Sequence, residues 1–167
     1  MTIWTVGHSR HELPALLGVL RGPGIEVVAD IRSQPFSRYN PQFNRERFGA
    51  ALQAAGLSYL FLGAELGGRP PELEFYDSDG HVRYDALART DRFNAGLGQL
   101  LAESDRRRVA MLCSEEDPRR CHRRLLVTRV LTARGIPVLH IRGDGSVVPE
   151  KDLGPLPQEM SQDTLFG

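Results

Sequence analysis

The chain has 167 residues, a length that fits one domain. Apolar residues make up 41% of it and charged residues 25%, which excludes a disordered or fibrous protein. The formal net charge is zero, so no overall positive charge indicates nucleic-acid binding.

Strand-like and helix-like segments alternate along the chain. The predicted strands, which are short and mostly apolar, are residues 3–6, 25–31, 57–62, 109–113 and 136–141. The predicted helices are residues 10–21, 43–55, 91–103 and 118–134. Ser9 and Glu12 form a capping box for the first helix, and Asp117 with Pro118 suits the start of the fourth. The pattern predicts a three-layer α/β domain, with a mainly parallel five-stranded sheet and helices on both faces.

The predicted α/β domain covers residues 1–143. Residues 144–167 are acidic and rich in proline and glycine, which predicts an extended C-terminal tail. Inside the domain, residues 63–90 are too long for an ordinary connection and predict either a functional flap or a structural excursion.

The location of the protein is also predicted from the chain. The longest uninterrupted apolar run, residues 15–20, is far shorter than the roughly 18–20 residues of a membrane span. No secretory signal is visible at the N-terminus, and two cysteines do not make a disulfide scaffold. We therefore expect a cytoplasmic protein that does not contact the membrane.

Polar side chains collect just after the predicted strands. His8 follows the first strand, Arg32 and Arg38 the second, Gly67 and Gly68 the third, and Cys113 and Glu115 the fourth. In an open parallel sheet, ligands bind beyond the carboxyl ends of the strands. The sequence therefore predicts a binding or catalytic cleft at this edge.

Four motifs at these positions resemble the domain-of-unknown-function 488 family. They are Gly7-His8-Ser9, Asp30-Ile31-Arg32 through Pro35 and Ser37-Arg38, Leu62-Gly63 with Leu66-Gly67-Gly68, and Cys113-x-Glu115-x-x-Pro118-x-x-Cys121-His122-Arg123. The resemblance covers about residues 2–142, and the last motif is its most specific part. It implies an α/β fold and supplies no established reaction.

Cys113, His8 and Glu115 are the candidate catalytic residues. A thiol between a strand and a helix N-terminus has a lowered pKa, which favours a nucleophile, although the nearby carboxylates favour a thiol that merely lines the site. His8 and Glu115 fit general base and acid if they face each other. A metal site from Cys113, Cys121, His122 and His8 is a weak alternative because Cys-x7-Cys-His is not a close-spaced zinc pair. No metal or cofactor is predicted.

The candidate anion contacts are arginines and glycines. Arg119, Arg120, Arg123 and Arg124 crowd the start of the fourth helix, where their charges oppose the helix dipole. Either local acidic residues or a bound anion offsets them. The predicted anion and substrate contacts are Arg32, Arg38, Arg123, His122, Gly67 and Gly68. Phe36, Tyr39 and Phe43 beside these arginines suit stacking on a base, and simple packing is the alternative.

The last residues resemble a peptide that binds the bacterial sliding clamp. Gln162, Leu165 and Phe166 form a Gln-x-x-Leu-Phe pattern, in which the two apolar side chains would fill a pocket on the partner. The alternative is that they pack onto the domain's own core.

These features together predict a protein that handles nucleic acid or a nucleotide, by hydrolysis or group transfer, in DNA replication or repair. Two alternatives stay open. One is a non-catalytic adaptor that binds a phosphorylated ligand or DNA, and the other is a small-molecule phosphate-ester enzyme unrelated to DNA.

Overall fold

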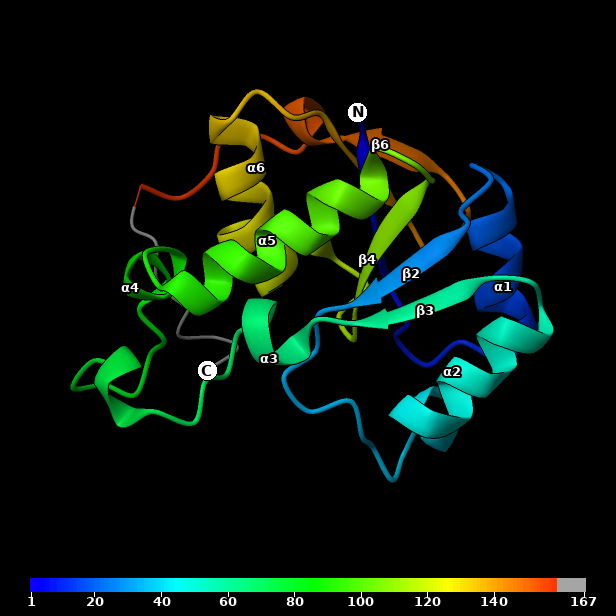
Figure 1. The fold of residues 1–167 in the computed structure, drawn as a ribbon, viewed down its shortest axis with the longest axis horizontal. Coiled ribbons are helices and arrows are strands. Elements are labelled where there is room, and N and C mark those ends of the chain that lie inside the picture. The colour runs from blue at the N-terminus through cyan, green and yellow to red at the C-terminus, as the bar shows by residue number, and fades with distance from the viewer. Residues whose placement is uncertain (159–167) are drawn as a thin grey trace.

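A computed structural model describes residues 1–158 of the chain (Figure 1). The strands are β1 (Ile3–Gly7), β2 (Val27–Asp30), β3 (Ser58–Phe61), β4 (Val109–Cys113), β5 (Val138–Ile141) and β6 (Val147–Pro149). The α-helices are α1 (Leu13–Arg21), α2 (Arg45–Ala54), α3 (Gly63–Leu66), α4 (Tyr84–Ala88), α5 (Asp91–Ser104) and α6 (Arg129–Ala133), and a π-helix, Arg123–Thr128, leads into α6. Short 3-10 turns span Pro41–Phe43, Leu73–Phe75, Pro118–Arg120 and Glu150–Asp152.

The strands form one mostly parallel sheet in the order β3-β2-β4-β1-β5-β6. The five predicted strands are all present and parallel, and β6 adds an antiparallel strand at the edge. This sixth strand lies inside the predicted tail, where Val147 pairs with Ile141 after a turn at Gly145, whose φ is +87°. The folded part of the chain therefore extends beyond residue 143.

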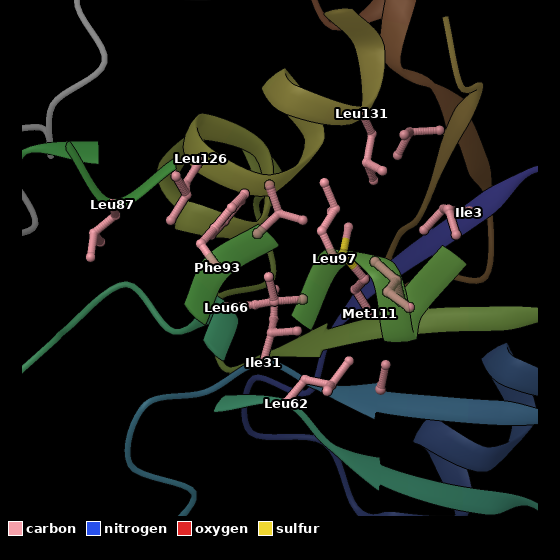
Figure 2. Close-up of a cluster of buried hydrophobic side chains, with 14 of the residues drawn as sticks. Ile3, Ile31, Leu62, Leu66, Leu87, Phe93, Leu97, Met111, Leu126 and Leu131 are labelled. Carbon is pink, nitrogen blue, oxygen red and sulfur yellow. The ribbon is translucent and has the colours of Figure 1, made fainter. Parts of the chain in front are cut away.

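Helices cover both faces of the sheet, which confirms the predicted α/β class (Figure 1). Every residue of β2 and β4 is buried, because alternate side chains enter two separate cores. One core lies between the sheet and α5, the π-helix and α6, as Figure 2 shows with Leu97, Met111 and Leu131. The other lies under α1 and α2 and includes Leu16 and Phe48.

The first helix begins later than predicted, at Leu13, and Ser9 does not cap it. Pro14 explains the difference. In a helix from residue 10, Pro14 would lie beyond the first turn, where its missing N–H costs a hydrogen bond. Ser9 instead adopts a left-handed conformation with φ of +47°, which turns the chain at the end of β1.

The predicted fourth helix is interrupted at Cys121. Asp117 caps only the 3-10 turn Pro118–Arg120, through a hydrogen bond from the Arg119 N–H. Cys121 is extended, with φ of −130° and ψ of 144°, and the helix resumes after it. Cys121 therefore lies before the helix rather than inside it.

The long connection, residues 63–90, is a packed part of the domain. It contains α3, α4 and an isolated bridge between Tyr76 and Val82, and it buries Leu66, Val82 and Leu87 in the core. This arrangement favours the structural excursion over a loose flap. Among the helices of residues 1–158, none combines the length and the apolar character needed to span a lipid bilayer.

Candidate functional site

The carboxyl ends of β1, β2 and β4 open onto a cleft of about 920 Å³. The neighbouring strands β1 and β4 lead to helices on opposite faces of the sheet, α1 and α6, so the chain separates between them. Such a switch in direction is where open α/β sheets bind ligands. The predicted site residues that line the cleft are His8, Arg32, Gly68, Cys113, Glu115 and His122.

Two sulfur atoms and one imidazole nitrogen meet in the cleft. Cys113 Sγ lies 3.6 Å from His122 Nδ1, and Cys121 Sγ lies 3.8 Å from the same nitrogen. His122 Nε2 is 2.9 Å from the Ile31 carbonyl oxygen, which can only accept, so Nε2 carries a hydrogen. Both cysteines are free thiols and both are buried.

The contacts in this cluster shift the pKa values of its members. A hydrogen bond with Cys121, followed by the contact with His122, holds the pKa of the Cys113 thiol well below its ordinary value despite burial. Burial and the neighbouring Cys113 raise the pKa of Cys121. Burial acts to lower the pKa of His122, but the interaction with Cys113 outweighs it and raises that pKa. Without a bound ligand, Cys113 is therefore the group of this cluster that ionises first.

The side chain of Arg123 fixes the loop after Cys113, residues 114–117, by hydrogen bonds to its backbone. The Arg123 guanidinium is fully buried and donates to the Glu115 carbonyl and, at 2.8 Å, to the Glu116 carbonyl. Gly7 at the end of β1 permits this packing, because a Cβ there would lie 1.8 Å from the Glu115 carbonyl oxygen. The loop backbone is therefore fixed from two sides.

Thr5 links Arg123 to the C-terminal part of the domain. Arg123 Nε donates to Thr5 Oγ1 at 3.1 Å, and Thr5 Oγ1 is 2.7 Å from His140 Nδ1. His140 Nε2 is in turn 2.6 Å from Glu150 Oε2, and Glu150 also forms an ion pair with Arg124 at 2.9 Å. These buried contacts anchor the segment that follows β6.

A second buried network fixes Arg32 and His8. Asp30 accepts from Arg32 Nε at 2.9 Å and from Nη2 at 2.7 Å, and Tyr59 donates to the same carboxylate at 2.5 Å. The His8 ring stacks on Phe43. Its Nε2 accepts a hydrogen bond from Arg32 Nη1, and its Nδ1 lies 2.8 Å from the Ser9 carbonyl oxygen. Burial lowers the pKa of His8, which keeps the ring neutral at pH 7.

The outer wall of the cleft is cationic and partly aromatic. Arg69 and Arg120 are exposed and line the cleft together with Arg32. Among the described residues that line it, Glu115 is the one carboxylate. Phe36 stands at the edge with 73% of its surface exposed.

Three predicted anion contacts lie outside the cleft lining. Arg123 has its guanidinium committed to the loop carbonyls and Thr5, so it supports the site from beneath and does not reach an anion. Arg38 is exposed and packs over Tyr39. Gly67 permits close packing instead, because a Cβ there would lie 2.2 Å from Ser33 Oγ.

Two of the crowded arginines after Asp117 pair with carboxylates at different distances along the chain. Arg119 pairs with its neighbour Asp117 at 3.0 Å, and Arg124 pairs with the distant Glu150 at 2.9 Å. The clamp-binding residues proposed from the sequence, Gln162, Leu165 and Phe166, lie outside the described residues.

Sequence reasoning missed Arg69 and placed Cys121 only in the weak metal alternative. Arg69 follows Gly67-Gly68 directly, so its position beside a close backbone approach was the available signal. Cys121 enters the cleft because the helix is interrupted there, and the adjoining Cys-His pair was the signal for a shared site.

Comparisons with known proteins identify one family. A family model described as Domain of unknown function DUF488 matches residues 12–130, which confirms the resemblance drawn from the motifs. No curated protein and no solved structure matches the chain.

Proposed function

The chain belongs to the DUF488 family, whose description names no reaction, and we propose from the cleft itself that it binds a phosphorylated nucleotide or nucleic acid and catalyses hydrolysis or group transfer on it. The observation that carries this proposal is the charge of the lining. Within residues 1–158, three arginines and one carboxylate line the cleft. Such a surface favours an anion.

The arginines favour phosphate among anions. A planar guanidinium donates two parallel hydrogen bonds to phosphate oxygens. Arg69 and Arg120 place guanidinium groups at the exposed wall of the cleft, and the buried Arg32, paired with Asp30 at 2.7 Å, lies beside them. Phe36, exposed at the edge, offers a flat face on which a base can stack. Phosphate contacts beside an aromatic surface suit a nucleotide better than a simple phosphate ester.

The reacting atom would lie over Cys113, between His122 and Glu115. Glu115 is exposed in the cleft and is placed to accept or deliver a proton. His8 was predicted as a general base, but its Nε2 already meets Arg32 and its ring is stacked on Phe43. We therefore assign His8 the positioning of Arg32 rather than proton transfer.

Binding of nucleotides by arginine variants tests this function. We would titrate the full chain with nucleoside mono-, di- and triphosphates and with a short single-stranded DNA carrying a 5′ phosphate. Arg120→Ala should weaken binding about tenfold or more, the cost of losing hydrogen bonds to a charged group. Arg38→Ala is the matched control, because Arg38 is exposed but does not line the cleft. Equal affinities of the two variants, or no binding by the native chain, would overturn the proposal.

Turnover is measured in the same panel. Any nucleotide that binds is incubated with the protein, and released phosphate or base is quantified. Glu115→Gln should abolish release while binding persists, since the amide cannot carry the proton. Binding without turnover in the native chain would identify an adaptor instead of an enzyme.

We also propose a cytoplasmic location and a role in DNA replication or repair through the sliding clamp. The two free thiols suit a reducing compartment. The clamp assignment rests on the sequence of the last residues, Gln162, Leu165 and Phe166. Clamp binding by the native chain that is lost in a Leu165→Ala/Phe166→Ala variant would support it, and absence of binding by the native chain would remove it.

A further inference from the structure

Cys113, Cys121 and His122 carry donor atoms that converge on one point of the cleft. Their Sγ, Sγ and Nδ1 atoms all lie within 4.8 Å of one another. We propose that these three side chains bind a Zn²⁺ ion and leave its fourth position open to the cleft. The catalytic role of the ion rests on the proposed hydrolytic function, whereas the presence of the site is argued from geometry alone.

The separations match those of a tetrahedral zinc centre. With Zn–S of about 2.3 Å and Zn–N of about 2.0–2.1 Å at a tetrahedral angle, a sulfur and a nitrogen ligand lie about 3.5–3.6 Å apart. The observed distances from His122 Nδ1 are 3.6 Å to Cys113 Sγ and 3.8 Å to Cys121 Sγ. Both sulfur–nitrogen distances therefore lie within a few tenths of an ångström of the value for a shared zinc ion.

The orientation of His122 also suits a metal ligand. Its Nε2–H points at the Ile31 carbonyl oxygen, 2.9 Å away, so Nδ1 is free to offer a lone pair toward both sulfurs. The single lone pair of Nδ1 can accept one good hydrogen bond, yet two sulfur atoms face it. One metal ion, by contrast, can be bound by all three atoms at once. Gly68 leaves room for the imidazole ring, because a Cβ at that position would lie 2.7 Å from His122 Cγ.

A backbone donor faces the sulfur of Cys121. The Arg123 backbone N–H donates to Cys121 Sγ at 3.4 Å, which the extended conformation of Cys121 makes possible. Two thiolates and one neutral imidazole balance the charge of a divalent ion. Sulfur and imidazole donors select zinc over magnesium or calcium, which prefer oxygen.

The site has the composition of a catalytic rather than a structural zinc centre. Structural sites have four protein ligands, whereas catalytic sites have three and bind water or substrate at the fourth position. Within residues 1–158, three donors form this group, and all three residues line the cleft. The open position is where the water of the proposed hydrolysis would bind, with Glu115 as the nearest carboxylate along the chain.

Metal binding is measured directly on the full chain. The protein is reduced, stripped with a chelator and titrated with Zn²⁺ in competition with a chromophoric chelator. We expect one ion per chain, bound more tightly than about 1 μM, and a Co²⁺ derivative whose absorption shows thiolate ligation and tetrahedral geometry. No stoichiometric binding, or a Co²⁺ spectrum without thiolate ligation, would overturn the proposal.

Variants assign the ion to these residues. Cys121→Ser and His122→Gln should each weaken zinc binding by more than about 100-fold, the upper range seen for loss of mere outer-shell partners. His81→Gln is the matched control, since His81 belongs to a separate exposed group with Asp77 and Asp79 and should leave binding unchanged. Unchanged binding in Cys121→Ser and His122→Gln, or loss in His81→Gln alone, would contradict the assignment.

A second readout needs no variant. In the native chain, one equivalent of Zn²⁺ should protect both cysteines from alkylation, as counted by mass spectrometry. Alkylation of both at the metal-free rate would refute the site even if a variant failed to fold. Nucleotide binding by the Arg120→Ala and Arg38→Ala proteins is measured in the metal-free state. Failure of the metal site would leave that comparison unchanged, so it is distinguishable from failure of the proposed function.

Discussion

Replacing Arg123 with Met tests whether this buried arginine holds the loop of residues 114–117. Met keeps an apolar stem but removes three hydrogen bonds, to Thr5 Oγ1 and to the carbonyls of Glu115 and Glu116. At about 1–1.5 kcal/mol each, their loss should lower the free energy of unfolding by about 3–4.5 kcal/mol. For a chain of this size the melting temperature should fall by about 6–18 °C. Guanidinium unfolding followed by the fluorescence of Trp4, the sole tryptophan, measures the change.

Arg119→Met is the control for this measurement. Arg119 lies four residues away and is 57% exposed in its side chain, with one ion pair to Asp117 at 3.0 Å. Exposed pairs of this kind contribute about 0–1 kcal/mol, so the control should unfold close to the native chain. A loss below about 1 kcal/mol in Arg123→Met, or equal losses in the two variants, would refute the role assigned to Arg123.

Two further predictions concern packing and pH. Gly7→Ala should lower the free energy of unfolding by about 1–3 kcal/mol, because its Cβ would lie 1.8 Å from the Glu115 carbonyl oxygen. Gly18→Ala, with nothing within 4 Å of its Cβ, should instead stabilise α1. Thermal unfolding compares the two variants, and equal shifts in melting temperature would contradict the close approach at Gly7. Burial lowers the pKa of His140 in the folded protein, so the unfolded chain binds the extra proton below about pH 6.5 and the free energy of unfolding falls as the pH decreases. Denaturant titrations between pH 7 and 5 should show a shallower fall in His140→Gln, and an equal slope would exclude this histidine as a source.

The sheet could be predicted because its strands are buried on both faces. Val27 and Val28 in β2, and Met111 and Leu112 in β4, enter opposite cores, so the sequence lacks the alternation of a half-exposed strand. Parallel strands bring their carboxyl ends to one edge, so the sequence alone predicts that His8 and Cys113 share a cleft, and both line it.

The other features depend on contacts between distant residues. The β6 strand is short and half-exposed, and it forms because β5 offers an edge to pair with. Arg123 resembles an exposed cation in sequence, and its burial involves a hydrogen bond to Thr5, which lies 118 residues earlier on β1. The interruption at Cys121 has no local signal, since Asp117 and Pro118 begin a 3-10 turn and an α-helix in the same way.

The chain of contacts through Thr5 gives every hydrogen in it a fixed direction. The Glu150 carboxylate, paired with Arg124, only accepts, so His140 carries its hydrogen on Nε2 and donates it to Glu150. In the neutral ring Nδ1 is then an acceptor, so Thr5 Oγ1 accepts from Arg123 and donates its own hydrogen to His140 Nδ1. A proton added at Nδ1 would turn this nitrogen from an acceptor into a donor, and the threonine hydroxyl hydrogen would have to point elsewhere. The protonation state of His140 on β5 is thereby linked, through Thr5 and Arg123, to the loop beside Cys113.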